Sequence, residues 1–151
     1  MDLIDEARLM QLLPLGGAER VLQVGPGAVP AAAVVYETDQ DFTTLPYEAG
    51  EFDVAACLWT VRRTRRPELL VAELVRVTKP GGRILVVDQL APVDPLAALD
   101  LNRAARAQDP SVTRVLAEGD LRALFDANNL TLRREEIVPG APDVGWFVLT
   151  R

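Results

Sequence analysis

The runs FDVAACL at residues 52–58, PELLVAELVRV at 67–77 and RILVVD at 83–88 decide the fold of this chain. The first and last runs are short and almost continuously apolar, which is typical of parallel strands covered on both faces. The middle run begins with proline and carries an apolar stripe at helical spacing, with Glu73 and Arg76 left for solvent. A strand, a crossover helix and a second strand predict a right-handed βαβ unit.

The rest of the chain predicts elements that pack onto this unit. Helices are expected over about 3–13 with Asp2 as cap, 95–107 with Asp94 as cap, and 118–127 with Asn128 and Asn129 as a left-handed cap. Strands are expected at 20–24, 34–37, 130–138 and 144–150, with a turn at 79–82 and an antiparallel hairpin formed by the last two strands. We therefore expect one α/β domain over residues 1–151.

Composition excludes several classes of function. The net charge of −6 gives no electrostatic basis for binding nucleic acid or an anionic membrane. No apolar run is long enough to span a bilayer and no signal peptide is recognised, so we expect a cytoplasmic protein. The chain has no histidine, the commonest general base and metal ligand, and no metal site is expected. Its single cysteine, Cys57, falls inside an expected strand and is interpreted as a buried structural thiol.

A family resemblance rests on the order of several segments. They are VLQVGPG at 21–27, LPY at 45–47, EFDV at 51–54, ELVRVTKPGGR at 73–83, and the closing hairpin. This order resembles class I S-adenosylmethionine-dependent methyltransferases, and most closely the type 11 group, which includes ubiquinone and menaquinone biosynthesis enzymes. The resemblance covers nearly the whole chain. It implies a Rossmann-like fold with a mostly parallel sheet. It also implies that the protein transfers a methyl group from S-adenosylmethionine to a small molecule.

The glycine motif departs from the family pattern. Gly25 and Gly27 match the cofactor-binding turn, but Gln23 stands where the family has a carboxylate that pairs with the cofactor amine. Val29 replaces the third glycine, where the family leaves room. The segment 28–33 is too short for the usual helix, strand and helix, so we expect these to be missing. The motif is either a weakened or lost cofactor site, or a tight turn kept for packing.

Two acidic positions bear on the cofactor. The family ends its second strand with an acid that holds both ribose hydroxyls; Glu37 is the nearest substitute, but its register suits the strand after that one. Asp41 and Phe42 align with the residues that meet the adenine amino group and line its ring. Asp41 is alternatively one of several solvated carboxylates in this loop.

An arginine-rich loop follows the strand at 52–58. It reads RRTRR at residues 62–66, where the family places a substrate-side histidine pair. Because guanidinium groups bind carboxylate and phosphate in a bidentate manner, Arg62 and Arg63 are candidates to face an anionic acceptor or partner. The alternative is a solvated loop whose charges offset the acidic segment 37–53. No residue is identified as catalytic.

Two functions follow from these observations. One is a methyltransferase with an unknown small-molecule acceptor; the other is a catalytically inactive relative that serves as a binding or scaffolding protein. The missing helices also predict a sheet face open to water. Because parallel strands are apolar on both faces, we expect a homodimer that buries this face or the short edge strand at 34–37.

Overall fold

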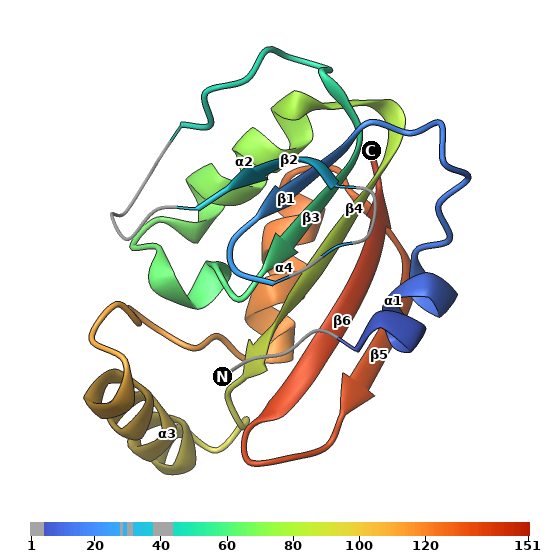
Figure 1. The fold of residues 1–151 in the computed structure, drawn as a ribbon. Coiled ribbons are helices and arrows are strands. Elements are labelled where there is room, and N and C mark those ends of the chain that lie inside the picture. Colours follow the sequence, from blue (N-terminus) through green and yellow to red (C-terminus); the bar gives the residue numbers. More distant parts are fainter. Residues whose placement is uncertain (1–4, 28, 30–31, 38–43) are drawn as a thin grey trace.

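Six strands form one sheet in the computed structural model, which describes residues 5–27, 29, 32–37 and 44–151 (Figure 1). They are β1 (Val21–Val24), β2 (Ala32–Tyr36), β3 (Phe52–Leu58), β4 (Thr78–Leu90), β5 (Thr131–Val138) and β6 (Asp143–Thr150). Their order in the sheet is β2-β1-β3-β4-β6-β5. The first four are mutually parallel, and β6 lies antiparallel between β4 and β5. The expected α/β class and closing hairpin are therefore confirmed.

Four helices accompany the sheet, together with one short 3₁₀ turn. They are α1 (Glu6–Leu12), α2 (Pro67–Val77), α3 (Pro95–Gln108), α4 (Glu118–Ala127) and η1 (Val61–Arg63). Apolar residues of α2 and α4 pack on one face of the sheet, and those of α1 pack on the other. Helix α3 stands away from the sheet at one end of the molecule (Figure 1). Within the described residues, no helix has the length and apolar composition needed to cross a membrane.

The helix ends were predicted with mixed success. Asp94 caps α3 by accepting a hydrogen bond from the backbone N–H of Ala97 at 3.0 Å, and Asn129 after α4 is left-handed with φ 56°, both as predicted. The first helix is shorter than expected, and its cap is Asp5, which accepts from the N–H of Arg8. The predicted cap, Asp2, lies outside the described residues.

The turn predicted at 79–82 is an excursion within β4. Along β3, Phe52 pairs with Thr78 and Val54 pairs with Arg83, so two steps on β3 correspond to five on β4. Residues 79–82 (KPGG) are not paired with β3 at this bulge, and β4 then continues to Leu90. A helix can therefore pass directly into a strand, since Thr78 both follows α2 and opens β4.

Two charged residues of α2 do not face solvent as expected. Arg76 donates hydrogen bonds to the carbonyl oxygens of Leu45 and Tyr47 at 3.0 and 2.8 Å and pairs with Glu73 at 2.6 Å. Glu73 in turn accepts from the backbone N–H of Leu45 at 2.8 Å, and its hydrogen bond with Arg76 lowers the Glu73 pKa. The pair fastens the segment before β3 onto α2, which holds Leu45 in the core.

The sheet face expected to be open is covered by this chain. Val21, Val54 and Ala56 on that face are fully buried in a cluster that includes α1 and Val29. Val35 on the edge strand β2 is the exception on this face, with 53% of its surface exposed. An open face therefore gives no basis for a dimer, and a homodimer that uses the edge strand β2 or another surface stays a prediction.

The contacts of the Arg76 side chain predict a loss of stability when this side chain is removed. We expect Arg76→Ala to lower the free energy of unfolding by about 1–3 kcal/mol, because two backbone carbonyls lose their donor and Glu73 loses its charged partner. Urea denaturation gives the value. Arg66→Ala is the control, since Arg66 pairs with Glu68 at the surface, and it should change stability by less than about 0.5 kcal/mol. Equal decreases in the free energy of unfolding in the two variants would contradict a stabilising role for the Arg76 contacts.

Candidate functional site

The carboxyl ends of β1, β2, β3 and β4 lie along one edge of the sheet. In open parallel sheets ligands bind outside this edge. The glycine turn follows β1, Glu37 follows β2 and Trp59 follows β3, while Asp88 lies near the end of β4. The candidate site is therefore built from these segments.

Gly25 is required by packing at this edge. It has φ +95°, and a Cβ there would lie 2.1 Å from the carbonyl oxygen of Leu58 and 2.2 Å from Oγ1 of Thr60. Its N–H donates to the carbonyl of Tyr36 at 2.9 Å, which ties the turn to the end of β2. Gly25 thus has a structural function that does not depend on a cofactor.

Gln23 holds the glycine turn in place. Its side-chain Nε2 donates to the carbonyl oxygens of Gly25 at 3.0 Å and Gly27 at 2.8 Å, and its Oε1 accepts from the N–H of Val29 at 2.9 Å. The side chain is 1% exposed, and both donors and the acceptor of its amide are used within the chain. The Gln23 amide is neutral and already hydrogen-bonded within the chain, at the position where the family has a carboxylate that pairs with the cofactor amine.

Val29 fills space beside the turn. It is buried at 6% exposure in the cluster that contains Leu9, Leu12 and Trp59. The position where the family leaves room for the cofactor is here part of the apolar core. Gln23 therefore provides no carboxylate, and Val29 no open space, at the two positions where the family resemblance implies them.

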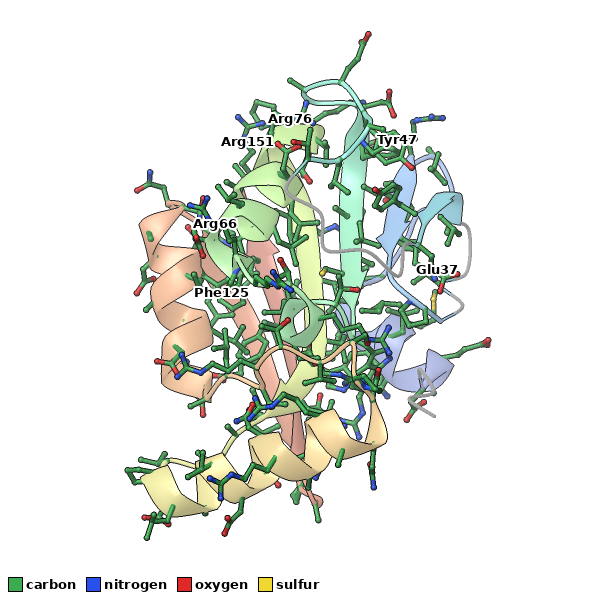
Figure 2. All side chains as sticks on the ribbon, turned by 90° about the vertical axis from the view of Figure 1, so that its left-hand side faces the viewer. Glu37, Tyr47, Arg66, Arg76, Phe125 and Arg151 are labelled. Atoms are coloured by element: carbon green, nitrogen blue, oxygen red, sulfur yellow. The ribbon has the colours of Figure 1, made fainter. Side chains whose placement is uncertain are left out.

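The sequence interpretation of Glu37 needs correction. Residues 32–36 pair in parallel with β1, so β2 takes the place of the family's second strand and not the one after it. Glu37 therefore stands directly after that strand, at the position of the ribose-binding acid. Its side chain is exposed, and no ion pair or hydrogen bond involves it among the described residues (Figure 2). The sequence missed this because the pairing of so short a strand depends on its neighbours.

Two of the predicted cofactor residues cannot be placed. Asp41 and Phe42 lie outside the described residues, so their contact with an adenine ring stays a prediction.

Arg62 is buried and paired with Asp88. The guanidinium Nη1 lies 3.3 Å from Oδ1 of Asp88, and the backbone N–H of Arg62 donates to Oδ2 at 3.2 Å. The side chains are 5% and 2% exposed, and the Arg62 guanidinium also lies 5.4 Å from the centre of the Trp59 ring. Burial outweighs the ion pair and raises the pKa of Asp88 to about 6. Arg62 is therefore neither a solvated charge nor one that faces open solvent to meet an acceptor.

Arg63 and Arg66 have acidic partners other than Asp88. Arg63 pairs with Asp109 at 3.2 Å and is half-buried. Arg66 pairs with Glu68 at 3.1 Å on the surface. The acidic partners of Arg62, Arg63 and Arg66 thus come from three different segments of the chain.

The η1 turn also anchors the segment that precedes α4. The carbonyl of Arg62 accepts hydrogen bonds from the N–H groups of Thr113 and Arg114 at 2.7 and 3.1 Å. Val112 and Val115 of this segment are buried against α3. Backbone hydrogen bonds therefore join the turn that follows β3 to the segment that precedes α4.

Comparison with known proteins supports the family resemblance. Residues 18–86 match the family model described as a methyltransferase domain. The uncharacterized methyltransferase YcgJ of Bacillus subtilis is 34% identical over 87 residues, which are 58% of this chain and 34% of YcgJ. A demethylmenaquinone methyltransferase of Mycolicibacterium vanbaalenii is 32% identical over 137 residues, covering 84% of this chain and 59% of that protein. The chain thus spans about a third to three fifths of these relatives.

Solved structures agree with the fold. An S-adenosylmethionine dependent methyltransferase from Mesorhizobium loti superposes with a TM-score of 0.74 at 13% identity, covering 96% of both chains. The YcgJ structure superposes with a TM-score of 0.71 at 22% identity, covering 87% of this chain and 71% of YcgJ. The resemblance and the Rossmann-like fold predicted from the sequence are therefore confirmed.

The Gln23 network predicts that a carboxylate is not tolerated there. In Gln23→Glu an oxygen replaces the nitrogen that donates to two carbonyls, so we expect the free energy of unfolding at pH 7 to fall by about 2–4 kcal/mol. The carboxyl pKa should be raised in the folded state, so part of the loss should be recovered as the pH falls. Gln11→Glu on the exposed side of α1 is the control and should change stability by less than about 0.5 kcal/mol. Equal stability of Gln23→Glu and the wild type would show that the network is not needed.

The buried pair predicts a pH dependence of stability. Because the pKa of Asp88 is higher in the folded chain than its ordinary value of 3.8, the folded state binds this proton more tightly. Wild-type stability, measured relative to Asp88→Asn, should therefore rise as the pH falls from about 6 to about 4. Urea denaturation at a series of pH values measures the difference.

Asp109 provides a control of opposite sign. Hydrogen bonds from Ser111, followed by the charge of Arg63, lower its pKa, so the stability it contributes is lost as the pH falls below about 4. The comparison of wild type with Asp109→Asn should show this slope. A difference between wild type and Asp88→Asn that does not vary between pH 4 and 6 would contradict the raised pKa.

Proposed function

We propose, from the methyltransferase domain that covers residues 18–86, that this chain is a methyltransferase-type domain that binds S-adenosylmethionine weakly or not at all. In this proposal it serves as a binding or scaffolding protein and not as an efficient enzyme. The observation that carries the proposal is the buried Gln23 side chain, whose amide makes hydrogen bonds to Gly25, Gly27 and Val29.

The methionine half of the cofactor has no charge partner in this arrangement. A carboxylate would attract the cofactor ammonium, whereas the Gln23 amide is neutral and already donates to two carbonyls. The Oε1 of Gln23 already accepts from the N–H of Val29, and Gln23 is 1% exposed, so a ligand ammonium has little access to its second lone pair.

The nucleoside half has a plausible partner in Glu37. Its exposed carboxylate follows the strand next to β1, and a carboxylate can accept hydrogen bonds from two ribose hydroxyls. Residual affinity should therefore come from the nucleoside, with little added by the methionine part.

An active methyltransferase is the second candidate, supported by the names of the curated relatives. In that case Gly25, Gly27 and Glu37 would hold the cofactor, and the small-molecule acceptor would meet it at the carboxyl edge of the sheet. Arg63 is the better of the two predicted acceptor-facing arginines, because it is half-exposed while Arg62 is buried against Asp88. With no histidine in the chain, rate enhancement would depend on positioning of donor and acceptor. The predicted cytoplasmic location stays a prediction under both candidates.

Calorimetric titration separates the candidates. We expect adenosine and S-adenosylmethionine to bind with similar dissociation constants, above about 100 μM, because the methionine part finds no charge partner. Glu37→Gln should weaken the binding of both by about tenfold, or to below detection, because a carboxylate that accepts from the ribose is lost. The same change at the exposed Glu48, in the loop before β3, is the matched control and should have no effect.

Two results would contradict the proposal. A sub-micromolar dissociation constant for S-adenosylmethionine would show an intact cofactor site. An affinity for S-adenosylmethionine a hundredfold above that for adenosine would show that the methionine end is bound productively despite Gln23 and Val29.

A further inference from the structure

Helix α3 is attached to the body of the molecule by one side only. Ala98, Leu101 and Ala105 pack against Ala91, Val112 and Val115 in a small cluster separate from the two sheet cores. Asn102 on the same side exchanges hydrogen bonds with the backbone of Val115, at 2.7 Å to its N–H and 3.3 Å to its carbonyl. The rest of the helix projects from the molecule, as Figures 1 and 2 both show.

The opposite side of α3 is apolar and exposed. Val93 before the helix is 94% exposed, Leu96 is 73% exposed and Leu99 is 43% exposed. Among the described residues these are three of the five large hydrophobic side chains that are exposed, and they lie within two turns of one another. Scattered exposed apolar residues are ordinary, but a group of this kind on a projecting helix indicates a contact surface.

Two opposite charges lie next to these apolar residues. At 100° per residue, Leu96, Asp100, Arg103 and Ala107 form one stripe directly opposite the packed side. Asp100 and Arg103 make no ion pair or side-chain hydrogen bond within the part of the chain that the structure describes, and both are exposed. We call Val93, Leu96, Leu99, Asp100, Arg103 and Ala107 the outer face of α3.

We propose that the outer face of α3 binds the outer face of α3 in a second copy of this chain, with the two helices antiparallel. A two-fold axis placed between residues 100 and 103 brings each Asp100 opposite Arg103 of the other copy. It also brings each Leu96 opposite the small Ala107 of the other copy. The face is thus self-complementary in charge and in size, which an isologous contact requires.

A second copy fits this surface better than a membrane does. The chain has a net charge of −6, and the outer face carries one acid and one base, so an anionic bilayer would gain nothing from it. Since two short helices give an interface at or below about 1,200 Å², we expect a reversible dimer that forms in the micromolar range. This proposal moves the predicted homodimer from the sheet to α3 and does not depend on the proposed function.

Sedimentation velocity over about 1–200 μM protein tests the proposal. We expect the wild type to change from monomer to dimer over this range, and Leu96→Glu to remain monomeric because it places two carboxylates in the apolar contact. Asp100→Arg and Arg103→Asp should each weaken dimerisation about tenfold by creating like-charge contacts. The double variant Asp100→Arg/Arg103→Asp should recover affinity to within about threefold of wild type, since the swapped charges again face opposite charges.

Val35→Glu is the matched control, because Val35 is exposed on the edge strand β2, which lies apart from α3 in both views (Figures 1 and 2). It should dimerise as the wild type does. Three results would overturn the proposal: a wild type that stays monomeric throughout, loss of the dimer in Val35→Glu but not in Leu96→Glu, or a double variant as weak as the single ones. Circular dichroism should show unchanged folding in all variants, because the substituted side chains are exposed.

Discussion

The structure depends on how the amide of Gln23 completes a very short connection between two parallel strands. Parallel neighbours are usually joined through a helix, whose own hydrogen bonds satisfy the crossing backbone. Here only residues 25–31 join β1 to β2, and the described part of this connection contains no helix. Two of its carbonyls and one N–H are satisfied by Gln23 instead. A carboxylate at this position could not donate to the two carbonyls, so the amide is a structural requirement of the shortened fold.

This requirement concerns the same positions at which the family resemblance implies cofactor contacts. The family resemblance implies an acid at position 23 and open space at position 29. With the helix lost, Gln23 has to hold the turn, and Val29 supplies apolar surface to the face that α1 also covers. The side chain of Gln23 and the residue Val29 therefore both take part in holding and packing the short connection, and a hydrogen bond joins them directly.

The sequence predicted the fold well because its signals are local. The strands at 52–58 and 83–88, the helix from Pro67 and the Asp94 cap each depend on a few neighbouring residues, and all are present. The site was predicted poorly because it depends on pairing between distant segments. Neither the parallel pairing that puts Glu37 beside the glycine turn nor the burial of Arg62 against Asp88 has a local signature. The same holds for Glu73 and Arg76, whose partners lie about 30 residues earlier in the chain.

The polar groups along the carboxyl edge of the sheet differ in how far they are used within the chain. At the β1 end Gln23 is occupied by the turn, and at the β3 and β4 ends Arg62 is occupied by Asp88 and by the segment before α4. An active site needs polar groups that are held in place yet still able to interact with a ligand. Gln23 makes hydrogen bonds, and Arg62 an ion pair, with groups of the same chain, whereas the exposed Glu37 makes neither among the described residues. The carboxylate of Glu37 is therefore accessible to a ligand at this edge, while the side chains of Gln23 and Arg62 are already engaged.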